Sequence, residues 1–207
     1  SVFASISFVG ILLLVLTSLY FMGLRYAANI QFVRALSESD LEKQTGLLIS
    51  AVNLDRNEDM HLRETANFLI ARVGRELANL NSLKNEADRS AAADRIKNFS
   101  AAAVNLMEDL TRRHGRDSRN WLVRASVFEN LINVVDGSDK RAVEIYQEYL
   151  KLSPKDPEPY LKIGSINFAA ADFLKQLGRA DLQNQISAGL KIAEDNYRKA
   201  IELKPNY

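Results

Sequence analysis

Two histidines are the residues of this chain best suited to holding a metal, because imidazole is a common ligand of zinc and related ions. They are His61 and His114, which stand far apart in the sequence. Each lies next to an expected turn, so we expect both side chains to be solvated and predict no shared metal site. The chain contains no cysteine, which excludes disulfides and thiolate metal sites.

The sequence also lacks the motifs that carry common enzyme chemistry. It has no glycine-rich phosphate loop, no metalloprotease helix motif and no nucleophile elbow. Its 27 basic and 26 acidic residues leave a net charge of +1, which provides no electrostatic attraction for nucleic acid. We therefore expect no catalytic site, no cofactor and no nucleic-acid partner.

The strongest pattern is a row of four residue types that occurs twice with the same internal spacing. Each row has a small residue, an aromatic residue, an apolar residue and a closing proline, which is typical of the second helix of a helix-turn-helix repeat. The rows are Ala142, Tyr146, Leu152 and Pro154, and Ala193, Tyr197, Leu203 and Pro205.

Bulky anchors mark the expected first helices. Tyr160 follows Pro154 and is followed by Ile163, Gly164 and Phe168, a row that would let a second helix approach closely. Trp121 is followed in the same way by Ala125 and Phe128. These rows resemble the tetratricopeptide repeat. Two residues depart from that pattern, Arg124 in place of a leucine and Tyr149 in place of an alanine.

The resemblance implies an all-α fold of helical hairpins, an α-solenoid. The apolar run before the repeats predicts one transmembrane helix. We expect the transmembrane helix in residues 1–24 and the repeats in residues 25–207, with units at 25–56, 57–115, 116–154 and 155–207. These units exceed the usual 34 residues, so we expect longer helices or larger turns inside them. The alternative is an irregular helical bundle without true repeats.

Local signals mark where several of the expected helices start or end. Ser39 followed by Glu42 predicts a capping box that starts a helix. Asp156 before Pro157 predicts another helix start. Gly137 predicts the break between two helices. No segment alternates with the period of a strand for long enough to indicate a sheet.

Residues 2–24 carry no charged side chain and are long enough to cross a bilayer. Tyr20 and Tyr26 lie where aromatic rings settle at the membrane boundary. A signal peptide is the alternative, although its apolar part is shorter and a basic start and a cleavage site should accompany it. We interpret the segment as a transmembrane helix that anchors the chain in the lipid bilayer.

The segment from Leu24 to Leu36 contains no proline, so the transmembrane helix is expected to continue as the first helix of the repeats. Arg25 and Arg34 lie just beyond the apolar span and favour a cytoplasmic location for the repeats.

The tetratricopeptide resemblance also implies a groove that binds a protein or peptide partner. Arg63 with Asn67 resembles the pair with which some members of that family hold a peptide carboxylate. The corresponding inner-face positions in later units are Leu122, Ser126, Asn130, Leu161, Ser165 and Phe168. The alternative is that these residues only face solvent or a neighbouring helix.

A narrower resemblance concerns the junction between the apolar span and the repeats. The run LRYAANIQFVRAL and the later YLKLSPKDPEPYLKIG look like the carboxyl-terminal tail of bacterial O-antigen ligase-like membrane proteins. That family implies a location in the bacterial inner membrane. It also implies that lipid-linked glycan is handled by upstream parts, so we expect several apolar spans before Ser1. A solenoid needs a polar-faced cap on its last unit, so we also expect at least one further helix after Tyr207.

We expect the intact chain to partition with membranes and to resist carbonate extraction. Arginines in place of Leu13 and Leu14 should abolish this, because a charge at the helix centre costs roughly 2.5 to 3.5 kcal/mol. Recovery of the unmodified chain in the soluble fraction would contradict the interpretation.

Overall fold

The computed structural model describes residues 2–80 and 82–206, with side chains from Ile6 onward. Within these residues the chain is helical and has no strand, so the predicted all-α fold class is confirmed. The expectations about Ser1 and Tyr207 lie outside the described residues. The helices are α1 (Val2–Ser37), α2 (Leu41–Leu54), α3 (Asp59–Leu80), α4 (Glu86–Arg113), α5 (Ser118–Asn130), α6 (Ser138–Leu152), α7 (Pro157–Gln176), a short 3-10 helix η1 (Ala180–Leu182) and α8 (Gln183–Leu203).

The chain divides into two compact units at the boundary between Leu69 and Ile70. The boundary falls within α3, which begins in the first unit and ends in the second. The division into four repeat units stays a prediction.

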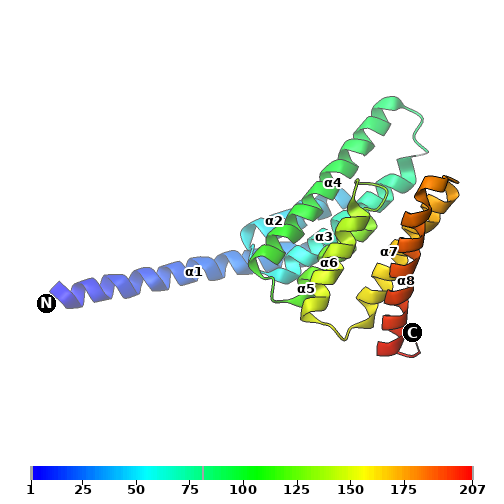
Figure 1. Ribbon diagram of the computed structural model, residues 1–207. Helices are drawn as coiled ribbons and strands as arrows, with labels where there is room; N and C mark the ends of the chain where they lie inside the picture. Colours follow the sequence, from blue (N-terminus) through cyan, green and yellow to red (C-terminus); the bar gives the residue numbers. More distant parts are fainter. Residues whose placement is uncertain (1, 81, 207) are drawn as a thin grey trace. The chain divides into compact units, whose positions relative to one another are not determined.

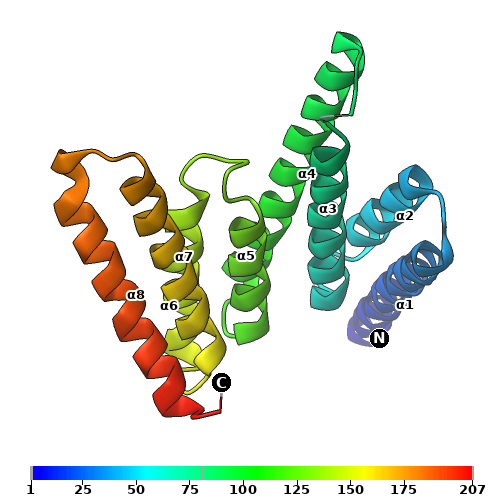
Figure 2. The same cartoon turned by 90° about the vertical axis from the view of Figure 1, so that its right-hand side faces the viewer.

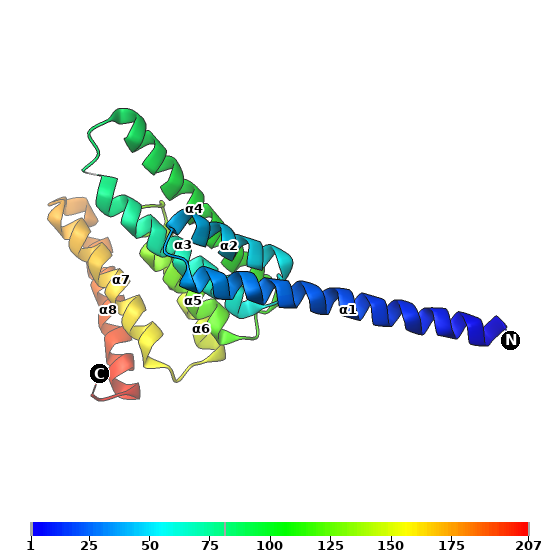
Figure 3. The same ribbon diagram turned by 180° about the vertical axis from the view of Figure 1, so that it is seen from behind.

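In the first unit α1 and α2 form a hairpin, and Figures 1 and 3 show α2 lying beside the C-terminal part of α1. Phe32 and Ala35 of α1 pack against Leu48 and Ala51 of α2, and Phe68 of α3 packs on the same cluster. The small alanines allow the two helices to approach closely, which buries the apolar stripe of each helix.

Polar contacts close both ends of this hairpin. The Gln44 side-chain amide donates to the Ala35 carbonyl at 2.9 Å. At the other end, the Arg25 guanidinium donates to the Asp55 carboxylate at 3.1 Å. The register of α2 along α1 is therefore set by polar contacts as well as by packing.

The start of α2 differs from the prediction. Asp40 caps the helix, and its carboxylate accepts from the backbone N–H groups of Glu42 and Lys43. Ser39 is not the cap, because the backbone becomes helical one residue later than the capping box requires. A carboxylate at this position also stabilises the positive end of the helix dipole.

The predicted continuation of the apolar helix is confirmed, since α1 runs without a break through Leu24 to Ser37. Among the described residues, the segment Ile6–Ser37 forms the one helix that is long and apolar enough to cross a membrane. Its most apolar stretch is not buried by the rest of the chain.

In the second unit a chain of arginine contacts joins successive helices. Arg95 of α4 donates to Glu76 of α3 at 2.8 Å. Arg124 of α5 is buried and donates to Glu108 and Thr111 of α4 at 3.0 and 2.9 Å. Arg124 stands where the repeat pattern has a leucine, and it joins α5 to α4 through an ion pair whose Glu108 side chain is 45% exposed.

Helices α5, α6 and α7 share one apolar core, and Figure 2 shows them with α8 as consecutive neighbours. Ala142 and Tyr146, from the first repeated row, lie in this core with Phe128. The predicted helix start at Asp156 and Pro157 is confirmed, with the Asp156 side chain accepting from the N–H of Glu158. Gly137 precedes α6 in the left-handed conformation that favours glycine, so the predicted break is confirmed.

Helices α7 and α8 approach closely at Gly164, as the row that begins at Tyr160 predicts. A Cβ atom on Gly164 would lie 2.6 Å from Cε1 of Tyr197 and 3.2 Å from the Ala193 carbonyl oxygen. Ala193 and Tyr197 belong to the second repeated row, so these two residues pack on the preceding helix as Ala142 and Tyr146 do.

We expect Gly164→Ala to lower the free energy of unfolding by about 1 to 3 kcal/mol, because the new methyl overpacks the contact with Tyr197. Gly46→Ala is the matched control, since no atom lies within 4 Å of its Cβ position. The control should raise stability by about 0.5 to 1 kcal/mol. Denaturant melts in detergent measure both effects, and equal effects of the two variants would contradict the close approach.

Candidate partner-binding groove

The two histidines lie in different environments, and one of them differs from the prediction. His61 is almost fully buried and stacks on Phe32 with ring centroids 4.4 Å apart, so it is not solvated. The prediction fails because the ring of Phe32, which belongs to α1, covers His61 at the start of α3. His114 is partly exposed at the end of α4. In the part of the chain that the structure describes, no three His, Cys, Asp or Glu side chains gather as a possible metal site.

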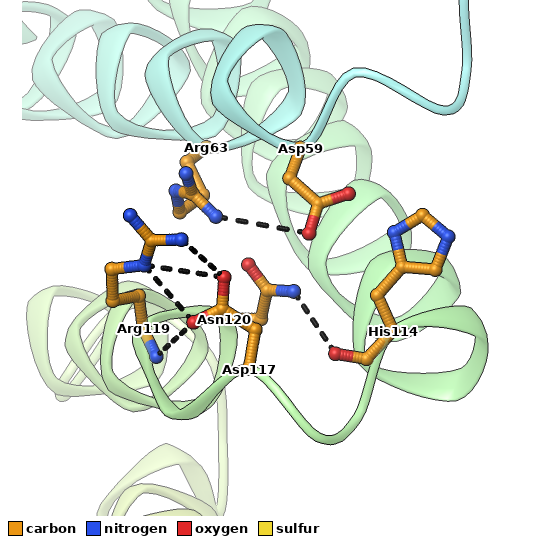
Figure 4. A network of polar contacts seen from close by, with 6 residues as sticks. All are labelled: Asp59, Arg63, His114, Asp117, Arg119 and Asn120. Atoms are coloured by element: carbon orange, nitrogen blue, oxygen red, sulfur yellow. Dashed lines mark hydrogen bonds and ion pairs between the residues drawn. The ribbon is translucent and has the colours of Figure 1, made fainter.

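Figure 4 shows the polar contacts near Arg63, the first residue of the predicted peptide-carboxylate pair. In the first unit the Arg63 guanidinium lies 3.9 Å from the Asp59 carboxylate, one helical turn away. Asn67 lies one turn further along α3 and is exposed. A peptide carboxylate that bound Arg63 would therefore compete with Asp59 for the guanidinium.

In the second unit, Figure 4 shows contacts at the start of α5. Asp117 caps this helix and also pairs with the Arg119 guanidinium at 2.7 Å. The Asn120 side chain is buried and donates to the His114 carbonyl at 3.1 Å. These contacts hold the connection between α4 and α5.

The other predicted inner-face residues interact with near neighbours. The Asn130 amide donates to the Ser126 carbonyl at 2.8 Å, so this pair lies along one face of α5. Ser165 is exposed on α7, and its Oγ lies 3.3 Å from the hydroxyl of Tyr197 on α8. Leu122 is half-buried and packs against the core shared by α5, α6 and α7.

One polar network crosses three helices beside the Ser126–Asn130 pair. The buried Tyr146 hydroxyl of α6 donates to the Glu129 carboxylate of α5. The Lys162 ammonium of α7 donates to the same carboxylate at 2.9 Å. Burial, followed by the hydrogen bond to Glu129, raises the pKa of Tyr146 well above its ordinary value. The hydroxyl therefore stays protonated and serves as a donor that holds the helices in register.

A groove of about 790 Å³ with apolar and polar lining lies further along α7, toward the C-terminal end of that helix. One wall is the connection between α5 and α6 with the first residues of α6, and the other is a face of α7 with Gln185 of α8. Phe173 is 62% exposed and Val135 is 41% exposed, so large apolar side chains from both walls face solvent. The apolar lining residues are Ile132, Val134, Val135, Ile166, Ala169, Ala170, Phe173 and Leu174.

The groove exists because neighbouring helices differ in length. The 20 residues of α7 pair with the 15 residues of α6, so the last turns of α7 extend past the start of α6. The connection that precedes α6 is held in shape by Leu131, which is fully buried, and by left-handed backbone at Asn133 and Gly137. Figure 2 shows this connection at the same end of the second unit as the C-terminal end of α7.

Comparisons with known proteins assign this chain to no family. No protein-family model matches the chain, and no curated protein matches it. A crystal structure of MamA aligns with 13% identity and a TM-score of 0.37, covering 84% of this chain and 94% of that one. MamA 41-end from Desulfovibrio magneticus RS-1 aligns with 16% identity and a TM-score of 0.38, covering 88% and 96%. At these values the fold assignment depends on the helices of this chain alone.

Sequence reasoning did not find the groove. The repeat pattern predicts contacts on the inner faces of the first helices of the units, and for the connections it predicts only larger turns. The signal was present in the run LINVV at residues 131–135, which is more apolar than a solvated connection requires.

We expect the stability of the protein to fall as the pH drops from about 7 to about 5. Burial lowers the pKa of His61 from 6.5, and the nearby carboxylates of Glu58 and Asp55 only partly oppose this effect. The unfolded chain therefore takes up a proton below its ordinary pKa while the folded chain does not, so acid favours unfolding.

Thermal melts in detergent at a series of pH values test this. His61→Phe keeps the aromatic stack and should flatten the dependence. Equal slopes for the unmodified chain and His61→Phe would contradict the assignment.

Proposed function

We propose that this chain is a membrane-anchored helical scaffold that binds a protein partner and has no catalytic site of its own. The observation that carries the proposal is the apolar groove between the α5–α6 connection and α7, with Val135 and Phe173 exposed on its two walls. Exposed apolar side chains gathered in a concavity are typical of protein-binding surfaces.

The groove suits a partner that inserts apolar side chains. Its charged lining residues are Asp136, Asp139 and Lys140, which are of both signs and lie at one end. Affinity would therefore come from burial of apolar area rather than from charge. Arg63 with Asn67 is proposed as a peptide contact of the first unit. Ser126, Asn130 and Ser165 are proposed separately as peptide contacts of the second unit.

Anchoring is proposed through α1, whose segment Ile6–Ser37 has the length and composition of a membrane span. Arg25 and Arg34 come after the most apolar part and support placing the remaining helices on the cytoplasmic side of a bacterial inner membrane.

A second candidate function is that of an accessory tail of an O-antigen ligase-like enzyme. The unbroken passage of α1 from its apolar part into the first hairpin favours it, because a last membrane span followed by repeats would have this form. In that case lipid-linked glycan would be handled by other parts of the protein, and Phe173→Asp would lower glycan transfer in cells without changing membrane insertion.

Site-specific crosslinking tests the scaffold proposal. A photo-crosslinking residue in place of Phe173 should form a protein adduct in native membranes, because this side chain lines the groove. Phe168 is the matched control, since it is 50% exposed on the same helix but does not line the groove.

The adduct formed at position 173 should disappear when Val135 is changed to Asp, which places a charge on the opposite wall. Both substitutions are at exposed positions, so the melting temperature should change little. Equal adducts at positions 168 and 173, or an adduct that survives Val135→Asp, would contradict binding in the groove.

A further inference from the structure

The first helix carries an apolar stripe that no other helix of its unit covers. Met22, Tyr26 and Val33 are 65%, 71% and 64% exposed. Their spacing places them on one face of α1, with the exposed Asn29 among them and the half-buried Ile30 at the edge of that face. Ala28, Phe32 and Ala35 are buried on the face that α2 covers. The exposed stripe therefore lies on the side of α1 that points away from α2.

This stripe is a continuation of the apolar surface of the proposed membrane span. From Ile6 to Val33 the helix has a length of about 40 Å at 1.5 Å per residue. The hydrocarbon core of a bilayer is about 30 Å thick. An upright helix would therefore hold the last part of the stripe in water. A helix tilted by about 40° would keep the whole stripe in contact with lipid, and this angle is at the upper end of the tilts observed for transmembrane helices.

The charges on α1 fit such a position. The helix has no acidic residue, and its two cations, Arg25 and Arg34, lie on opposite borders of the stripe. The Arg25 side chain is 63% exposed even though it contacts Asp55, and Arg34 is exposed. Arginines in this arrangement can extend to lipid phosphates while the apolar residues between them remain in the bilayer.

We propose that α1 crosses the membrane at a steep tilt and lays the stripe Tyr26, Ile30 and Val33 against the boundary between headgroups and acyl chains. Because α2 packs on the opposite face of α1, the tilt turns α2 away from the bilayer. The first hairpin then has a defined orientation, with its α1 side on the lipid and its α2 side in water. This inference rests on the proposed membrane anchor and specifies how the anchor lies.

Single-cysteine labelling of the full chain tests the orientation, since the natural sequence has no cysteine. Val33→Cys, Lys43→Cys and Leu13→Cys would each carry an environment-sensitive NBD probe in phosphatidylcholine vesicles that contain phosphatidylglycerol. Lys43 is the matched control, because it is exposed in the first turns of α2, at the end of the hairpin where α1 finishes. Leu13 reports whether the span is inserted at all.

We expect the probe at Val33 to emit at shorter wavelength and to lose most of its fluorescence to lipids with a shallow nitroxide. The probe at Leu13 should be quenched by a deep nitroxide, and the probe at Lys43 should resemble a probe in water.

Three results would overturn the proposal. Quenching at Leu13 but not at Val33 would mean an upright helix, with the anchor intact. Equal quenching at Val33 and Lys43 would mean that both helices of the hairpin lie on the membrane. Efficient disulfide formation between Val33→Cys chains at low protein-to-lipid ratio, without quenching, would mean that a second copy covers the stripe. Absence of quenching at Leu13 would instead contradict the anchor itself.

Discussion

Close packing of consecutive helices through small residues is the constraint on which the rest of this structure depends. Ala28 and Ala35 bring α1 against α2, and Gly164 brings α7 against the Tyr197 ring of α8. Each helix buries a narrow stripe, so much of its remaining surface stays available to solvent, lipid or a partner. A helix that buried a wider face would leave neither the stripe on α1 nor the groove beside α7.

The polar side chains between these helices fix how neighbouring helices align, and we assign them no catalytic role. Arg124 pairs with Glu108 and Thr111 across α4 and α5, and Glu129 accepts from Tyr146 and Lys162 across α5, α6 and α7. Arg124 and Tyr146 are buried, so removing the partner of either would leave a buried polar group without its hydrogen bond, and each contact therefore restricts how the helices can slide. Such restriction keeps a binding surface in one shape, which agrees with the proposed role of a scaffold.

Differences in helix length create the features that distinguish this chain from a regular array of hairpins. The last turns of α7 extend past α6 and leave apolar side chains exposed opposite the α5–α6 connection. At the other end of the chain, α1 is far longer than α2, and its apolar surface continues beyond the hairpin. Both features leave apolar side chains exposed, because no other helix of the same unit packs on them.

Periodicity, proline and capping residues act locally, so the sequence was enough to predict the helical class, the long apolar first helix, the helix start at Asp156 and the helix break at Gly137. The row that contains Gly164 also predicted a close approach of a second helix, because a small residue leaves room for one. Two predictions were wrong, the cap at Ser39 and the solvation of His61. The burial of His61 depends on Phe32, which is distant in the sequence. The groove beside α7 could not be predicted either, because it requires the end of α7 and the α5–α6 connection to meet in space.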